Sequence, residues 1–251
     1  MNGSEDLLTK RELLLAMDRE SIRTPNIPVL KFIKEAEYLS AEAQKDKEAL
    51  EGVGLDWNLV LDLLVRIGAL RQAESIWFKS RYKEEELERE WDTKSNQGYE
   101  LRDAMLHAFR YAFGEDEQLL RRVSEIASGR TDDDMVQDLS HLAELGRDYT
   151  HLLEAIRFPL AQLEQAANLS DELGTLMALA AGERSDTSED LDLRNRAYTH
   201  LKEAVDKIRG AGQYVFWRDA ERRQHYVSMY HRETRRGSRS GAADQGVVLE
   251  S

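Results

Sequence analysis

Two long stretches of the chain place hydrophobic residues at intervals of three and four, the spacing of an amphipathic helix. The first stretch covers residues 56–113 and is strongest between Val60 and Trp77. It weakens across the charged residues 79–94, of which residues 83–90 are nearly bare of apolar side chains, and then resumes. The polar run Ser-Asn-Gln-Gly at residues 95–98 is the place where we expect this helix to break or turn.

The second stretch covers residues 188–236. Its apolar positions follow a seven-residue repeat through residues 198–229, although the polar residues Asp219 and Arg222 occupy two core-facing positions of that repeat. We expect one helix over the whole stretch, because polar residues at such positions can fix the register against a neighbour. The segment before it, residues 182–189, has low hydrophobicity and is predicted as a loop.

Shorter helices are expected in the remaining parts of the chain. Residues 2–23 and 29–49 carry helical spacings and are separated by two prolines. Residues 115–182 contain several further helices, with a break between two of them near residues 168–171. Thr131, followed by three aspartates, is a typical N-cap of one of these helices.

The composition supports an all-α fold. Only three prolines and 15 glycines occur in 251 residues, too few for the many turns of a β-sandwich or barrel, and no strand pattern is present. We predict an elongated helical bundle with two long helices (about 56–113 and 188–236) and several shorter packed helices. One helical domain, residues 1–236, is expected to contain a long-helix part (28–113 and 188–236) and a short-helix part (115–182), followed by a disordered tail (237–251).

Candidate catalytic chemistry is sparse. The chain has no cysteine, no nucleophile elbow and no phosphate-binding loop. Two Asp-x-x-His pairs, Asp138 with His141 and Asp148 with His151, resemble half of a carboxylate metal site, but no second helix supplies an equivalent pair. We interpret these residues as the solvated flank of short helices. The sequence therefore predicts no catalytic residue, no metal site and no cofactor.

Two glycines lie inside the second helical pattern. Gly210 and Gly212 each cost about 1 kcal/mol relative to alanine at such a position. Glycine is retained inside a helix when a neighbouring element must approach the backbone closely. We therefore expect a packing role for both residues.

The charge of the chain is distributed unevenly. The formal net charge is −13, whereas residues 212–239 contain seven arginines against Asp219, Glu221 and Glu233. Residues 1–211 hold a net charge of −15, so a basic segment follows an acidic body. The basic segment also carries five aromatic rings, from Tyr214 to Tyr230.

Four interpretations of this basic, aromatic segment compete: an intramolecular lid, a protein-docking surface, a nucleic-acid-binding segment and a helix lying on an anionic membrane. An acidic residue within the apolar positions argues against lipid. Arginine, tyrosine and tryptophan are enriched at interface hot spots, which favours protein–protein contact. The interface candidates are Phe216, Trp217, Arg218, Arg222, Arg223, Tyr226, Tyr230 and Arg232, with residues 79–94 as a further contact region.

The sequence thus predicts a non-enzymatic structural or assembly protein. Its expected partners are further copies of the chain or other protein subunits, and no small-molecule substrate is inferred. The alternative is a nucleic-acid-binding accessory protein that uses the basic aromatic helix. No apolar run approaches the roughly 20 residues of a membrane span, and no signal-peptide pattern is present, so a cytoplasmic location is expected.

Overall fold

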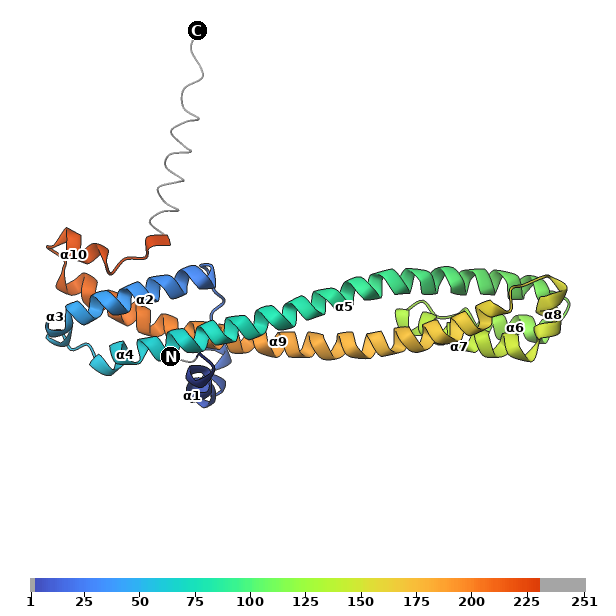
Figure 1. Ribbon diagram of the computed structural model, residues 1–251, viewed down its shortest axis with the longest axis horizontal. Coiled ribbons are helices and arrows are strands. Elements are labelled where there is room, and N and C mark those ends of the chain that lie inside the picture. Colours follow the sequence, from blue (N-terminus) through green and yellow to red (C-terminus); the bar gives the residue numbers. More distant parts are fainter. Residues whose placement is uncertain (1–2, 231–251) are drawn as a thin grey trace, which may run out of the picture. The chain divides into compact units, whose positions relative to one another are not determined.

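The computed structural model describes residues 3–230, and all regular elements in that range are helical. This confirms the predicted all-α fold class. The elements in chain order (Figure 1) are α1 (Gly3–Leu15), the 3₁₀ turn η1 (Arg19–Ser21), α2 (Val29–Lys45), α3 (Lys47–Glu51), α4 (Trp57–Leu61), α5 (Leu63–Ala112), α6 (Glu117–Ile126), α7 (Asp132–Asp148), α8 (Thr150–Ala155), α9 (Ala161–Val215) and α10 (Ala220–Gln224).

The first predicted long helix is confirmed as α4 followed directly by α5, but the expected break at residues 95–98 is wrong. Asn96 donates from its side chain to the carbonyl of Asp92 at 2.7 Å, so this polar residue bonds back to the preceding helical turn. Gly98 serves packing rather than turning, because a Cβ at this position would lie 2.7 Å from Sδ of Met135 and 3.0 Å from Leu173. Glycine here lets two neighbouring side chains approach the backbone.

The bounds of the second long helix differ from the prediction. Helix α9 begins at Ala161 rather than near residue 188, and it ends at Val215 rather than near residue 236. The predicted loop at residues 182–189 and the predicted break near residues 168–171 are both wrong, because α9 is continuous through them.

The polar stretch of α9 forms ion pairs with α5. Glu183 pairs with Lys83, and Arg184 lies 3.7 Å from Glu88. Gly182 has open space around its α-carbon, so it neither packs nor turns. Low hydrophobicity is common both to loops and to helix surfaces covered with charged side chains. In this stretch it belongs to a helix surface, and hydrophobicity alone does not distinguish the two cases.

The N-terminal helix is shorter than the predicted 2–23. Arg196 on α9 lies at the C-terminal end of this helix, where its Nη1 donates to the carbonyls of Leu14 at 3.1 Å and of Met17 at 2.9 Å. These bonds satisfy acceptors that a helix leaves unpaired at its C-terminus. Asp18 then caps the η1 turn by accepting from the N–H of Glu20.

The chain divides into two compact units, which we call unit 1 (residues 1–79 and 188–251, described over 3–79 and 188–230) and unit 2 (residues 80–187). Each unit has its own buried hydrophobic cluster. That of unit 1 is formed by residues such as Phe32, Leu63 and Leu201, and that of unit 2 by residues such as Phe109 and Leu142. The single-domain organisation stays a prediction.

In the part of the chain that the structure describes, no helix combines the length and the apolar character that crossing a membrane requires.

Candidate interaction surface at the C-terminal end of α9

The basic aromatic segment does not continue α9 as a straight helix. The chain turns after Val215, and α10 begins at Ala220 beside α2 (Figure 1). Asp219 starts helix α10, because its carboxylate accepts from the N–H groups of Glu221 at 3.1 Å and Arg222 at 3.0 Å. A residue that the seven-residue repeat places toward a core therefore acts as an N-cap.

Tyr226 is the buried residue that holds the folded-back segment. Its side chain is fully buried, and its hydroxyl donates to Oδ2 of Asp46 at 2.8 Å. The ring lies directly on the backbone of Gly212, where a Cβ would come within 2.1 Å of Cδ1. The ring of Phe216 stacks on it at 5.7 Å between centroids. Burial raises the pKa of the Tyr226 hydroxyl to about 12.

Gly212 has the packing role that the sequence predicts, although its neighbour is a tyrosine ring rather than a helix. Gly210 does not have such a role, because no heavy atom lies within 4 Å of the position that its Cβ would occupy. The two glycines differ because only one of them faces the folded-back segment.

Two buried carboxylates at α2 anchor the segment by its polar groups. The side chain of Asp46, at the C-terminal end of α2, is 3% exposed and pairs with both Tyr226 and Arg222. Glu35 accepts from the N–H of Tyr230 at 2.7 Å and from Oγ of Ser228 at 3.1 Å. Hydrogen bonds to a charged acceptor are stronger than those between neutral groups.

Glu35 also pairs with Arg209 of α9, whose Nη2 lies 2.6 Å from Oε2. Burial by itself raises the pKa of Glu35, but the hydrogen bonds from Tyr230, Arg209 and Ser228 outweigh it. The net pKa is lowered, so Glu35 stays a carboxylate while the segment is in place.

The structure places the predicted interface residues in two groups. Tyr226 is sealed within its own chain, Phe216 and Tyr230 are half-buried, and Arg222 is committed to Asp46 while its guanidinium lies over Phe216. For these residues the intramolecular lid describes the observed contacts, and a role in an interface requires the segment to leave its site.

The second group remains in solvent. Trp217 is 61% exposed, and the guanidinium of Arg218 lies 4.3 Å above its ring. Tyr214, which the candidate set omits, is 72% exposed, and Arg223 is exposed on α10. We call Tyr214, Trp217 and Arg218 the aromatic corner. Arg232 lies outside the described residues.

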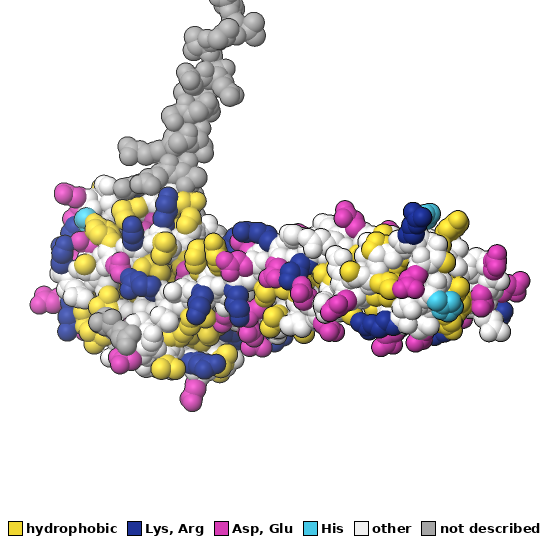
Figure 2. All heavy atoms as spheres, turned by 45° about the vertical axis from the view of Figure 1, so that its right-hand side comes forward, with side chains coloured by type: hydrophobic (Ala, Val, Ile, Leu, Met, Phe, Trp, Pro, Cys, Tyr) yellow, Lys and Arg dark blue, Asp and Glu magenta, His cyan; other side chains and the backbone are white. Residues whose placement is uncertain are grey.

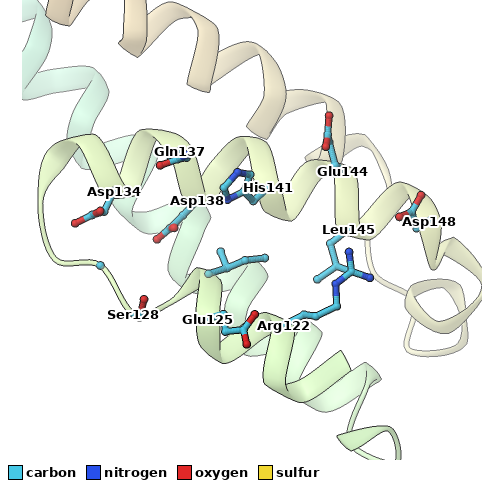
Figure 3. A pocket seen from close by; sticks show the side chains of 12 residues that line it. Arg122, Glu125, Ser128, Asp134, Gln137, Asp138, His141, Glu144, Leu145 and Asp148 are labelled. Atoms are coloured by element: carbon cyan, nitrogen blue, oxygen red, sulfur yellow. The ribbon is translucent and has the colours of Figure 1, made fainter. Parts of the chain in front are cut away.

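A groove between α6 and α7 of unit 2, with a volume of ≈460 Å³, contains the Asp-x-x-His pair (Figure 3). Asp138 is buried and pairs with Nε of Arg102 at 2.6 Å, so its assignment to a solvated flank is wrong. Burial raises the pKa of Asp138 despite this arginine. The histidine of the pair, His141, is exposed.

Asp134 in the same groove has a structural role. Its carboxylate accepts from the N–H groups of Arg130 and Thr131, and hydrogen bonds from Thr131 and Arg130 lower its pKa. Thr131 forms the predicted N-cap of α7 and completes a capping box with this aspartate. Across residues 3–230, no group of three or more His, Asp or Glu side chains is arranged to hold a metal ion.

The charged stretch 79–94 lies on α5. Within it Arg81 pairs with Glu85 at 2.9 Å, one helical turn away, and Lys94 reaches Glu172 of α9 at 3.1 Å. Exposed pairs of this kind contribute little each, at most about 1 kcal/mol. They make this stretch a solvated helix surface.

Comparison with known proteins finds no matching family model, no similar curated protein and no similar solved structure.

Proposed function

We propose that the chain is a non-enzymatic assembly protein that docks onto an acidic protein surface through the aromatic corner. One observation carries the proposal: two large rings, Tyr214 and Trp217, stay mostly in solvent beside a stacked arginine. Tryptophan, tyrosine and arginine dominate the binding energy of protein interfaces, because they bury large areas at a small cost in rotamer entropy.

The anchoring of the neighbouring segment supports this proposal. Tyr226 and the carboxylates of Asp46 and Glu35 fix the chain just beyond the aromatic corner. A surface that is already ordered loses less entropy on binding than a flexible one, so more of its contact energy appears as affinity.

The distribution of charge supports a second copy of the chain as the partner. Unit 2 contains 12 Lys and Arg against 24 Asp and Glu, a formal net charge of −12, whereas unit 1 contains 23 against 24. Acidic side chains outnumber basic ones on the face of unit 2 in Figure 2. Arg218 and Arg223 thus find their electrostatic complement on unit 2 of another copy.

Sedimentation velocity at low and high salt tests the proposal. We expect the native chain to self-associate at low salt and to dissociate at high salt, because salt screens contacts between opposite charges. The double variant Trp217→Ala, Arg218→Glu should lack this salt-dependent association. Leu8→Ala, which truncates another side chain that is 66% exposed, is the control and should associate like the native chain.

A native chain that stays monomeric at all concentrations and salts would exclude self-assembly through this corner. Salt-sensitive retention on DNA or RNA that Arg218→Glu, Arg223→Glu abolishes would instead favour the nucleic-acid-binding alternative. A cytoplasmic location is part of the same proposal, and fractionation of cells that make the protein tests it.

A further inference from the structure

We infer that residues 219–230, the C-terminal strap, are exchanged between two copies of the chain. In the exchanged pair, the strap of each copy occupies the acceptor cleft of the other, which we define by Glu35, Asp46 and Gly212. This inference rests on the proposed function and deepens it, since it names the segment that a second copy receives. It concerns a different contact from that of the aromatic corner.

The contacts of the strap do not depend on which chain supplies it. Tyr226 fills the space above Gly212 and donates to Asp46, while the backbone of Tyr230 donates to Glu35. Every one of these bonds joins the strap to α2 or to the end of α9, and each is reproduced when the strap of a second copy docks in the same way. The exchange therefore retains all of these contacts between the strap and the cleft.

The turn between α9 and the strap has the composition of a hinge. The turn, residues 216–219, is Phe-Trp-Arg-Asp, without the glycine or proline that usually enforces a turn. The seven-residue repeat of α9 continues across them to Met229. Residues 216–218 thus suit both the observed turn and an extension of α9, which carries the strap, with its Asp219 cap, away from its own cleft.

An extended hinge keeps the strap competent to bind. Arg222 and Tyr226 are four residues apart, so within a helical strap they lie on the same face. Both side chains contact one carboxylate, that of Asp46, in the observed structure. Residues that share a helix face can meet a single acceptor on another copy as well.

Concentration decides between the two forms. The strap of the closed monomer is tethered to its own cleft at a high effective concentration, so the closed form dominates in dilute solution. Exchange forms one particle from two, and its share therefore rises with protein concentration.

Cysteine crosslinking tests the exchange, because the chain has no cysteine of its own. Tyr38 on α2 and His225 on the strap are in contact, with ring centroids 5.8 Å apart, and both are partly exposed. We would make Tyr38→Cys and His225→Cys in separate chains, refold the two together at high concentration and treat them with a short bismaleimide. We expect a covalent dimer that contains one chain of each kind.

Two controls make the result decisive. A single chain with both substitutions should give an intrachain crosslink in dilute solution, which shows that the reagent spans the contact. Leu8→Cys mixed with His225→Cys measures crosslinking by collision. A mixture of Tyr38→Cys and His225→Cys that gives no more heterodimer than this collision control would overturn the exchange.

A Gly-Gly-Ser insertion after Arg218 supplies a second test. It relaxes the turn and breaks the helical continuation, so the heterodimer should be lost while the intrachain crosslink is retained. An unchanged heterodimer would contradict the proposed hinge. Failure of the aromatic-corner proposal is detected separately. In that case the double variant Trp217→Ala, Arg218→Glu would sediment like the native chain.

Discussion

His200 on α9 is a buried histidine held against positive charge. The residue is 6% exposed, its Nδ1 lies 3.3 Å from Nη1 of Arg66, and this Nη1 also donates to the carbonyl of His200 at 2.7 Å. Burial lowers the pKa of His200 to about 4, and the positive charges of Arg66 and Lys10 act in the same direction. The folded chain therefore keeps this imidazole neutral well below the ordinary histidine pKa of 6.5.

This environment predicts a loss of stability in mild acid. Below pH 6.5 the unfolded chain binds a proton at His200 that the folded chain does not bind until about pH 4. The free energy of unfolding should therefore fall by roughly 2 kcal/mol through this residue between about pH 7 and pH 5. Urea unfolding of the native chain and of His200→Gln across this range measures the effect.

The difference in stability between the native chain and His200→Gln should shrink as the pH falls, since only the native chain carries the penalty. His107→Gln, on the exposed face of α5, controls for the loss of a histidine. A pH-independent difference between the native chain and His200→Gln would contradict the assignment of the effect to this site.

At the scale of the helix, Gly210 and Gly212 form a matched pair on α9. Alanine at residue 210 meets open space and should stabilise the helix by about 1 kcal/mol. Alanine at residue 212 meets the ring of Tyr226, and overpacking of this kind costs about 1–3 kcal/mol. We expect Gly210→Ala to raise the free energy of unfolding and Gly212→Ala to lower it, as measured by urea denaturation.

Limited trypsin digestion separates a local from a global effect of these glycine variants. Displacement of Tyr226 releases the strap, so Gly212→Ala should be cut faster than the native chain after Arg222 and Arg223. Gly210→Ala should be cut at the native rate. Equal digestion of both variants would show that Gly212 does not hold the strap in place.

Periodicity predicts elements well where a hydrophobic stripe is continuous and buried. The stripe from Val60 to Trp77 identifies the first long helix, and the Thr131 cap identifies the start of α7. Residues 95–98 and 182–189 mislead because Gly98 packs against Met135 and Leu173, while Glu183 and Arg184 pair with side chains of α5. These partners lie far away in the chain, up to 100 positions for Glu183 and Lys83, so no local pattern contains them.

The candidate site shows the same limit. Its aromatic and basic residues are evident from composition, and Asp219 followed by Glu221 is a local cap signal that marks the end of the long helix. The burial of Tyr226 is not evident from the sequence, because it depends on Asp46, 180 residues away, and on the absence of a Cβ at Gly212. The sequence does not show which rings stay exposed, because the fold determines which ring is buried.

For the whole molecule, the division into two units also divides the charge. Of the formal net charge of −13, unit 2 accounts for −12. The sequence indicates an acidic body and a basic end, but the contrast lies between a strongly acidic unit 2 and a nearly neutral unit 1. Unit 2 therefore carries most of the like-charge repulsion that the folded chain must overcome.

The separate core of unit 2 predicts that residues 80–187 fold without the rest of the chain. Their hydrophobic cluster includes Phe109, Leu139 and Leu142, all fully buried by residues of the same unit. An isolated 80–187 fragment should be helical by circular dichroism and should unfold cooperatively in urea. Because the fragment has a net charge of −12, added salt should raise its unfolding midpoint by screening repulsion. Leu142→Ala should lower its stability by about 2–5 kcal/mol, whereas a fragment without a cooperative transition would show that this core needs the remaining helices.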